Sequence, residues 1–433
     1  MAVTFLAAIL VGTGLLMLPF TTFSGRISLV DALFTATSGI CVTGLIVKDT
    51  ATYFTPAGQM IILFLFQLGG LGIMTFSTLI MLVAGKKISI KDRIIIQEGF
   101  HHAGYRDVKS IIKNIFYFTM ALELAGTLSF FLRWQREFSW LKALFYSVFH
   151  SISAFCNAGF VLFSNSFMGY RDDAWINTTL IILIVVGGLG FLVIDGARDA
   201  LLGLIKRKKT KVSLHTKLVL SLTLMLIVFS LVLFLIIEWN QSLRGFGTKG
   251  KIFSSLFQII TPRTAGFNTM DLNSLGFAVV FLLIMLMFIG ASPGSTGGGV
   301  KTSTIGVIFA FIKSRIQARE SVGLFYRTFP LEMVTKAFTL VSLAAALIFL
   351  SSFILLLTQP QASMREVLFE VFSAFGTVGL SLGLTPKLTP LGKIVIVITM
   401  YIGRIGPLTL LYAFSKEKAY GRFEYEEETV MIG

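Results

Sequence analysis

Charge is scarce in this 433-residue chain: charged residues make up 14% of it, against about 25% in a typical soluble domain. Histidine and cysteine are scarcer still, with four and two copies. The histidines are scattered, and no cluster of histidine, aspartate or glutamate forms a catalytic set, so we do not expect an enzyme. Cys41 and Cys156 allow at most one disulfide, and we interpret them as small apolar residues instead.

Apolar sequence fills most of the chain. Hydrophobic residues make up 55% of it, the mean hydropathy is +0.83, and apolar runs long enough to cross a bilayer core of about 30 Å recur. The net charge of +15 lies in short loops between these runs, a pattern that orients membrane proteins and does not indicate nucleic-acid binding. The first run begins at Ala2 without a basic leader, so we expect a spanning helix and no signal peptide. The sequence predicts a multi-pass protein of the cell membrane, surrounded by lipids.

One short motif occurs four times: two residues lead into a glycine, and a large apolar residue follows. The copies are Val42-Thr43-Gly44, Asn157-Ala158-Gly159, Thr264-Ala265-Gly266 and Thr377-Val378-Gly379. A phenylalanine anchor precedes each glycine by ten residues, or by nine in the third copy: Phe34, Phe149, Phe257 and Phe369. A second glycine signal follows in a long apolar run, at Gly69, Gly187, Gly290 and Gly403. Two linked signals that recur in phase predict a four-fold internal repeat.

The four motifs predict a pore. Glycine allows unusual backbone dihedrals and leaves no side chain in the way. Four such segments around one axis could point carbonyl groups inward, in place of the water shell of an ion. A short helix aimed at the axis would add the negative end of its dipole, which favours a cation. The alternative is that these glycines only allow helices to pack closely, as is common in membranes.

The expected fold is all-α, with four consecutive repeats around a central pore. Each repeat would hold an outer helix, a short re-entrant pore helix and an inner helix, which gives eight transmembrane helices. The expected pore helices cover 31–39, 145–155, 253–260 and 367–375. The repeats span 1–87, 108–205, 206–328 and 329–433, the last with the C-terminal tail, and a charged linker spans 88–107. Basic linkers between repeats place those linkers, and both termini, in the cytoplasm.

The third inner helix is expected to be broken at membrane depth. Its sequence there is Gly290-Ala291-Ser292-Pro293-Gly294-Ser295-Thr296-Gly297-Gly298-Gly299, which a helix cannot accommodate. Irregular backbone is tolerated at that depth where it lines a cavity or is enclosed by protein. We therefore expect a movable gate below the filter; a flexible linker and a phosphate-binding loop are the alternatives. The phosphate loop fails on spacing, because Val300 separates the last glycine from Lys301.

Three titratable residues lie inside apolar segments. Arg404 occurs in the fourth inner helix and needs partners or water there. The carbonyl groups of the 290–299 loop are natural partners, so we expect a gating role, with a snorkelling arginine as the alternative. Glu123 is either a functional carboxylate or one that faces inward and pairs with a neighbouring helix. His150, inside the second pore helix, is interpreted as a structural histidine.

These motifs resemble those of the KtrB-type membrane subunits of bacterial Ktr potassium uptake systems, which share a superfamily with TrkH-type and HKT-type transporters. The resemblance covers essentially the whole chain, and its most specific parts are the filter glycines, the Gly-rich loop and the segment Gly403-Arg404-Ile405-Gly406-Pro407. It implies a K+-selective filter, in which Gly44 stands where Na+-selective HKT relatives have serine. It also implies that the 290–299 loop is an intramembrane gate that interacts with Arg404.

The resemblance further implies a homodimer on a cytosolic ring of KtrA-type nucleotide-binding subunits. K+ would be the transported ion, Na+ an activating or coupled ion, and the nucleotide would bind only to the partner subunit, since the chain shows no cofactor site of its own. An alternating-access, cation-coupled secondary transporter is the alternative, because broken helices and repeats also occur there. Only one glycine per repeat predicts weaker discrimination between K+ and Na+ than a tetrameric potassium channel achieves.

Overall fold

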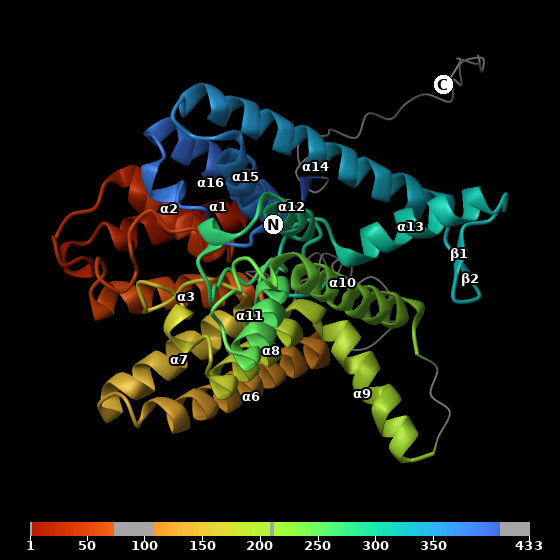
Figure 1. Cartoon of the computed structure of the whole chain (residues 1–433), viewed down its shortest axis with the longest axis horizontal. Helices are drawn as coiled ribbons and strands as arrows, with labels where there is room; N and C mark the ends of the chain where they lie inside the picture. Colours follow the sequence, from red (N-terminus) through yellow and green to blue (C-terminus); the bar gives the residue numbers. More distant parts are fainter. Residues whose placement is uncertain (1, 73–107, 208–211, 408–433) are drawn as a thin grey trace.

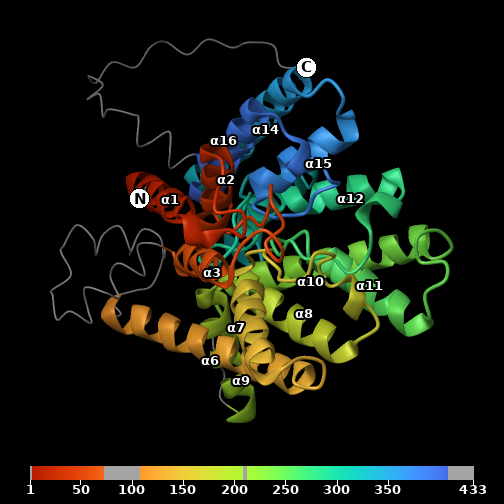
Figure 2. The same ribbon diagram turned by 90° about the vertical axis from the view of Figure 1, so that its left-hand side faces the viewer.

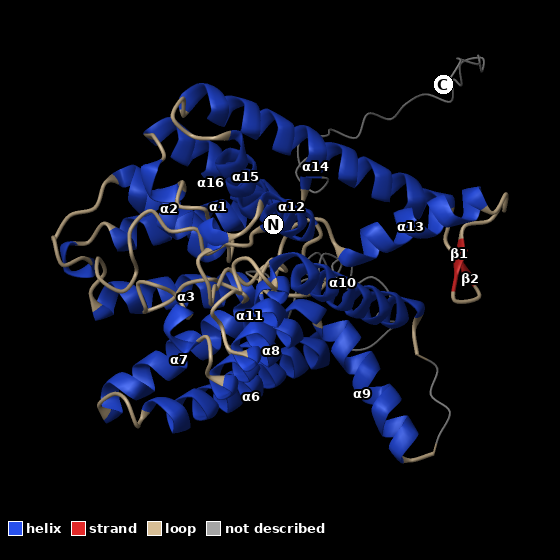
Figure 3. Cartoon of the chain, viewed as in Figure 1, coloured by secondary structure: helices blue, strands red, loops and turns tan. Residues whose placement is uncertain are grey.

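The computed structural model describes residues 2–72, 108–207 and 212–407, and these are predominantly helical (Figure 3). Within those ranges the only paired strands are β1 (Gly323–Leu324) and β2 (Arg327–Thr328), which form a small antiparallel hairpin. The expected helical class is therefore confirmed. The predicted 88–107 linker, the far end of the first inner helix and the C-terminal tail lie outside the described residues.

The helices fall into four groups in chain order (Figure 1). The first holds α1 (Ala2–Leu16), α2 (Leu29–Ile40) and α3 (Pro56–Leu71). The second holds α6 (Val108–Trp134), α7 (Trp140–Cys156), α8 (Ala174–Leu189) and α9 (Phe191–Ile205). The third holds α10 (Leu214–Glu238), α11 (Thr248–Ile260), α12 (Phe277–Phe288) and α13 (Thr302–Ile316). The fourth holds α14 (Leu331–Thr358), α15 (Met364–Gly376) and α16 (Pro390–Ile405).

The four groups surround the centre of the molecule in sequence order, as Figure 2 shows from red through yellow and green to blue. One contact repeats at each joint: the inner helix of one group packs on the pore helix of the next. The pairs are α3 with α7, α8 with α11, α12 with α15, and α16 with α2. An ion pair of 2.6 Å between Lys393 on α16 and Asp31 on α2 completes the last joint. The groups therefore form a closed ring.

Local sequence fixes where several of these helices begin. Ser28 caps α2 by accepting a hydrogen bond from the Asp31 amide, which satisfies one of the free N–H groups of the first turn. Ser363 and Glu366 form a capping box at the start of α15. The hydroxyl and amide of Ser363 donate to the Glu366 carboxylate and thereby lower the pKa of Glu366. The helices α2 and α15 start earlier than expected because their capped first turns lie upstream of the apolar stretch.

Burial separates the inside of the ring from its outer surface. The anchor phenylalanines Phe34, Phe149, Phe257 and Phe369 are all fully buried. Three described helices are long and apolar enough to cross a membrane, namely α6 over Ile112–Trp134, α10 and α14, and most of their surface is exposed. Burying this apolar surface requires lipid or another protein. The eight expected spans and the re-entrant position of the pore helices stay predictions.

All four inner helices are interrupted, not only the third. α3, α8 and α16 each end just before a glycine of the repeated patch, and these glycines, Gly72, Gly190 and Gly406, have φ of +79°, +83° and +92°. This conformation cannot continue a right-handed helix. After Gly190 the chain turns by 104° into α9. The sequence predicts continuous inner helices over about 56–84, 175–204 and 391–414, and this prediction is wrong because each helix ends before Gly72, Gly190 or Gly406.

Candidate functional site

The four motif glycines lie in a closed ring. A methyl group on Gly44 would lie 2.7 Å from the Cα of Gly159, and one on Gly266 would lie 2.9 Å from Gly159 and 3.3 Å from the Cα of Gly379. One on Gly379 would lie 3.1 Å from the Cα of Gly44. The glycines follow each other around the centre in chain order, with φ between +72° and +91°. Any side chain here would meet backbone, so the close approach itself requires glycine.

The backbone repeats at a second position, which the sequence does not reveal. The residue two places before each glycine also has a positive φ: Val42, Asn157, Thr264 and Thr377, at 56°, 57°, 78° and 51°. Such values are uncommon for residues other than glycine, and rare for a β-branched residue. Positive φ values in four equivalent places, three of them at β-branched residues, indicate that a similar backbone geometry is imposed on all four segments. The intervening residues Thr43, Ala158, Ala265 and Val378 are also fully buried.

The second glycine of each repeat has a packing role. In three repeats a methyl group there would collide with a carbonyl oxygen in the last turn of the pore helix: Ile40 for Gly69, Phe155 for Gly187 and Phe375 for Gly403. The inner helix can therefore lie directly on the end of the pore helix. In the third repeat, Gly290 packs on Gly298 of its own loop instead. That difference makes room for the 290–299 loop.

The 290–299 loop lies between repeats two and four, next to the glycine ring. On one side, the amides of Ser292 and Thr296 donate to the carbonyl oxygens of Gly188 and Gly187 at 3.1 and 3.3 Å. On the other side, the amide of Gly298 donates to the Thr377 hydroxyl at 2.9 Å. The loop is also folded on itself, through Gly290 N to Val300 O, Ala291 N to Gly298 O and Ser295 Oγ to Ser292 O. Pro293 and Gly294 pack against Gly190, at the bend between α8 and α9.

Two cationic side chains hold this loop. The Arg404 guanidinium donates to the carbonyl oxygens of Thr296 and Gly69, and so joins α16, the loop and α3. The Lys301 ammonium donates to the carbonyl oxygen of Gly297 at 2.7 Å. No carboxylate in the described part of the chain forms an ion pair with either cation. The predicted contact between Arg404 and the loop carbonyls is present, and backbone oxygens are what satisfy the charge.

Glu123 faces inward and is paired. Its side chain is 4% exposed, and the Gln67 amide donates to both carboxylate oxygens at 3.0 and 3.1 Å. The Cys156 thiol in turn donates to the Gln67 carbonyl at 3.2 Å. This matches the second of the two interpretations left open for Glu123. Cys41 and Cys156 are both buried and free, so no disulfide joins them, and the Cys156 thiol is a hydrogen-bond donor as well as a small buried residue.

Sequence reasoning missed a set of polar residues behind the ring. The residue after each anchor phenylalanine is polar and buried: Thr35, His150, Gln258 and Glu370. The His150 Nε2 atom accepts from the amide of Leu162 at 3.1 Å, and Nδ1 lies 2.7 Å from the carbonyl of Tyr146. Glu370 accepts from the hydroxyls of Ser381 and Thr385. The sequence contained a signal for this set, because a polar residue directly follows each of the four anchor phenylalanines. The structural interpretation of His150 is confirmed.

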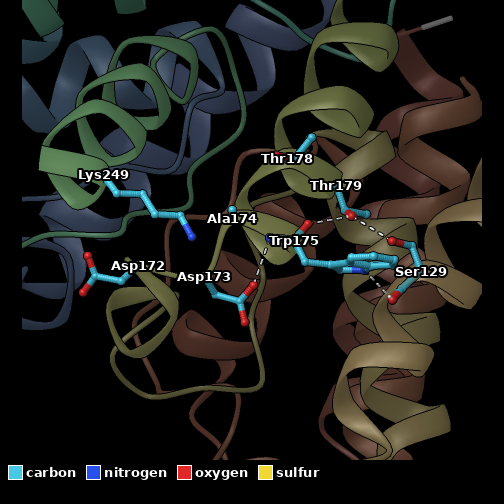
Figure 4. A pocket seen from close by; sticks show the side chains of 8 residues that line it. All are labelled: Ser129, Asp172, Asp173, Ala174, Trp175, Thr178, Thr179 and Lys249. Atoms are coloured by element: carbon cyan, nitrogen blue, oxygen red, sulfur yellow. Dashed lines mark hydrogen bonds between the residues drawn. The ribbon is translucent and has the colours of Figure 1, made fainter.

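A surface pocket of about 700 Å³ lies apart from the ring, at the start of α8 (Figure 4). Its polar groups serve the local fold. Asp173 caps α8 and accepts from Arg133 at 2.7 Å, and the Trp175 indole donates to the carbonyl of Ser129 at 3.0 Å. None of the residues predicted for the filter or gate lines this pocket.

Known proteins share both this sequence and this fold. Residues 3–424 match the TrkH family, described as cation transport proteins. The chain is 40% identical over 440 residues to the Ktr system potassium uptake protein B of Bacillus subtilis. This alignment covers 100% of this chain and 96% of that protein. The chain is also 37% identical over 439 residues to the potassium/sodium uptake protein NtpJ of Enterococcus hirae, with the same coverage.

The crystal structure of the potassium transporter TrkH from Vibrio parahaemolyticus has the same fold. Its TM-score is 0.72 at 21% identity, over 96% of this chain and 85% of that one. Apolar helices around a ring of backbone segments, together with these matches, define a membrane transporter of cations and not an enzyme. The chain belongs to the TrkH family of cation transport proteins.

Proposed function

We propose that this protein takes up K+ across the cell membrane through a gated, K+-selective pore at the centre of the ring. The observation that carries the proposal is the closed ring of Gly44, Gly159, Gly266 and Gly379, each in the same backbone conformation. Rings of backbone carbonyl groups replace the water shell of K+ in selective pores. The relatives in Bacillus subtilis and Vibrio alginolyticus, at 40% and 38% identity, are named potassium uptake proteins.

The filter would be formed by the motif glycines and the two residues before each of them. These twelve residues are Val42, Thr43, Gly44, Asn157, Ala158, Gly159, Thr264, Ala265, Gly266, Thr377, Val378 and Gly379. The pore helices α2, α7, α11 and α15 end at these segments. Their C-terminal dipoles place partial negative charge there, which favours a cation over an anion.

The gate would be the 290–299 loop, held by Lys301 and Arg404. The loop bonds to repeats two and four, and Arg404 ties it to repeat one. Hydrogen bonds hold the loop to its neighbours, so it can be released by breaking them without moving a helix. Opening would require these bonds to break together.

The remaining elements of the proposal concern the membrane and the partners. The four groups would be four repeats with re-entrant pore helices and eight spanning helices, and both termini would lie in the cytoplasm. The protein would form a homodimer on a cytosolic ring of nucleotide-binding subunits. The Ktr system names of its relatives support the presence of partner subunits. Na+ would activate or accompany uptake; the name of the Enterococcus hirae relative includes both ions.

The test is ion flux into liposomes that contain the purified protein, with Gly44→Ser beside the wild type. A side chain at residue 44 would lie 2.5 Å from the carbonyl oxygen of Ala158 and would have to adopt a φ of +87°. We expect K+ flux to dominate in the wild type and Na+ flux to rise in the variant. Gly245→Ser is the matched control, because Gly245 also has a positive φ, of +101°, but nothing lies within 4 Å.

Two outcomes would contradict the proposal. If Gly44→Ser leaves the ratio of K+ to Na+ flux unchanged, the ring is not the filter. Alternating access, with one coupled site, then becomes the better mechanism. If the control variant changes the ratio as much as Gly44→Ser does, the effect comes from general backbone strain and not from the ring.

A further inference from the structure

One residue at the C-terminal end of each pore helix is bonded to its filter segment in the same way. Its carbonyl oxygen accepts a hydrogen bond from the amide of the residue just before the motif glycine, at 2.8 or 2.9 Å. These four residues are Ser38, Ser153, Thr261 and Ser373, and all are fully buried. The bond spans four residues in the third repeat and five in the others. The residue missing from the third repeat is therefore missing between Thr261 and Gly266, and the four hydrogen-bonded residues are structurally equivalent.

All four equivalent residues carry a hydroxyl group, but the hydroxyls are used in two opposite ways. Those of Ser38 and Ser373 accept from the amides of Gly44 and Gly379, at 3.0 and 3.1 Å. That of Ser153 donates to the carbonyl oxygen of Phe160 at 2.7 Å. Thr261 makes the same bond as Ser153, to the carbonyl oxygen of Phe267 at 2.6 Å. Repeats one and four thus anchor the glycine itself, whereas repeats two and three anchor the residue after it.

We infer that these four hydroxyls position the filter and that they divide it into two unlike halves. This inference rests on the proposed function. In repeats one and four, the hydroxyl fixes the peptide that joins the motif glycine to the residue before it, and therefore the direction of that carbonyl group. In repeats two and three, the hydroxyl donates to the carbonyl oxygen of the residue after the glycine, Phe160 or Phe267. That oxygen has one lone pair fewer to offer and becomes a poorer ligand for an ion.

The consequence concerns the outer side of the glycine ring. No hydrogen bond among the described residues reaches the carbonyl oxygens of Leu45 and Leu380, the counterparts of Phe160 and Phe267. An ion just beyond the glycines would therefore be coordinated mainly by repeats one and four, which are neighbours in the ring. Such a site is asymmetric and weak. Most of the discrimination between K+ and Na+ would therefore depend on the carbonyl groups just before Gly44 and Gly379, which Ser38 and Ser373 hold in place.

The experiment compares two pairs of variants in the liposome assay: Ser38→Ala and Ser373→Ala against Ser153→Ala and Thr261→Val. Removal of the acceptor leaves a buried glycine amide without its partner. The loss of one such bond changes an equilibrium by about fivefold. We expect the first pair to lower the ratio of K+ to Na+ flux by about that factor, and Ser38→Thr to restore it. The second pair should not lower the ratio.

Ser147→Ala is the matched control, because Ser147 is also buried on a pore helix but donates to Ala143 one turn earlier in the same helix. Thermal unfolding of each variant reports any loss of stability separately. An equal fall in the ratio for both pairs, or no fall in Ser38→Ala, would overturn the inference while wild-type selectivity still upholds the proposed function. A wild type that does not select K+ would overturn both.

Discussion

Replacement of Arg404 by methionine is expected to open the pore. Arg404 is the one side chain that joins the 290–299 loop to both the first and fourth repeats among the described residues, through Thr296 and Gly69. Methionine has a similar length but cannot donate a hydrogen bond. The two carbonyl oxygens lose their donor, and the loop keeps its contacts with repeats two and four, the bond from Lys301 and its internal bonds.

The size of the effect follows from the two bonds. A hydrogen bond that involves a charged group contributes about 1.5 kcal/mol at the lower end of its range, so the pair contributes about 3 kcal/mol to the closed loop. That amount changes the ratio of closed to open protein by about 150-fold. Water that enters the open loop and solvates the two carbonyl groups does not reduce this figure, because the net value already includes such exchange.

The assay is K+ efflux from liposomes without any cytosolic partner. We expect the variant to leak K+ at a rate up to about 150 times that of the wild type. Arg315→Met is the control, because Arg315 lies exposed near the end of α13 and stacks on Phe311. If Arg404→Met unfolds at the wild-type temperature yet conducts no faster, contacts other than those of Arg404 hold the loop closed.

Two further predictions concern stability. Glu123→Leu should destabilise the protein by about 1 kcal/mol, because the half-buried Gln67 amide loses its acceptors. Glu123→Gln should lose less, and equal unfolding temperatures for the two variants would show that this pairing is unimportant. Gly403→Ala should lower the unfolding temperature, since the methyl group would meet the carbonyl group of Phe375. Gly14→Ala, in open space on α1, should have no such effect and can stabilise the helix by about 0.5–1 kcal/mol.

Much of the site was predictable because repetition is visible in the sequence. The four glycines, the anchors and the shorter third lead-in all appear as spacings, and each has a counterpart in the structure. The contact of Arg404 with the loop followed from the cost of an unpaired charge in an apolar segment. These predictions depend only on residue types and on the spacing between motifs, and both can be read from a single sequence.

Other features could not be predicted in this way. The hydroxyls of Ser38 and Ser153 differ only in which atom of the filter they face, and that depends on three-dimensional placement. The helix ends at Gly190 and Gly406 were missed because a glycine in an apolar run is also compatible with a continuous helix. Gln67 lies 56 residues from Glu123, and nothing in their local sequences relates them.

The joint between α16 and α2 affects how the protein is made. Three joints of the ring connect groups that follow each other along the chain, but this one pairs Lys393 with Asp31, 362 residues earlier. It cannot form until the last repeat has been synthesised and inserted. Throughout that interval the carboxylate of Asp31 has no cation, and α2 has no fourth-repeat neighbour. Closure of the ring therefore depends on the last repeat to be synthesised.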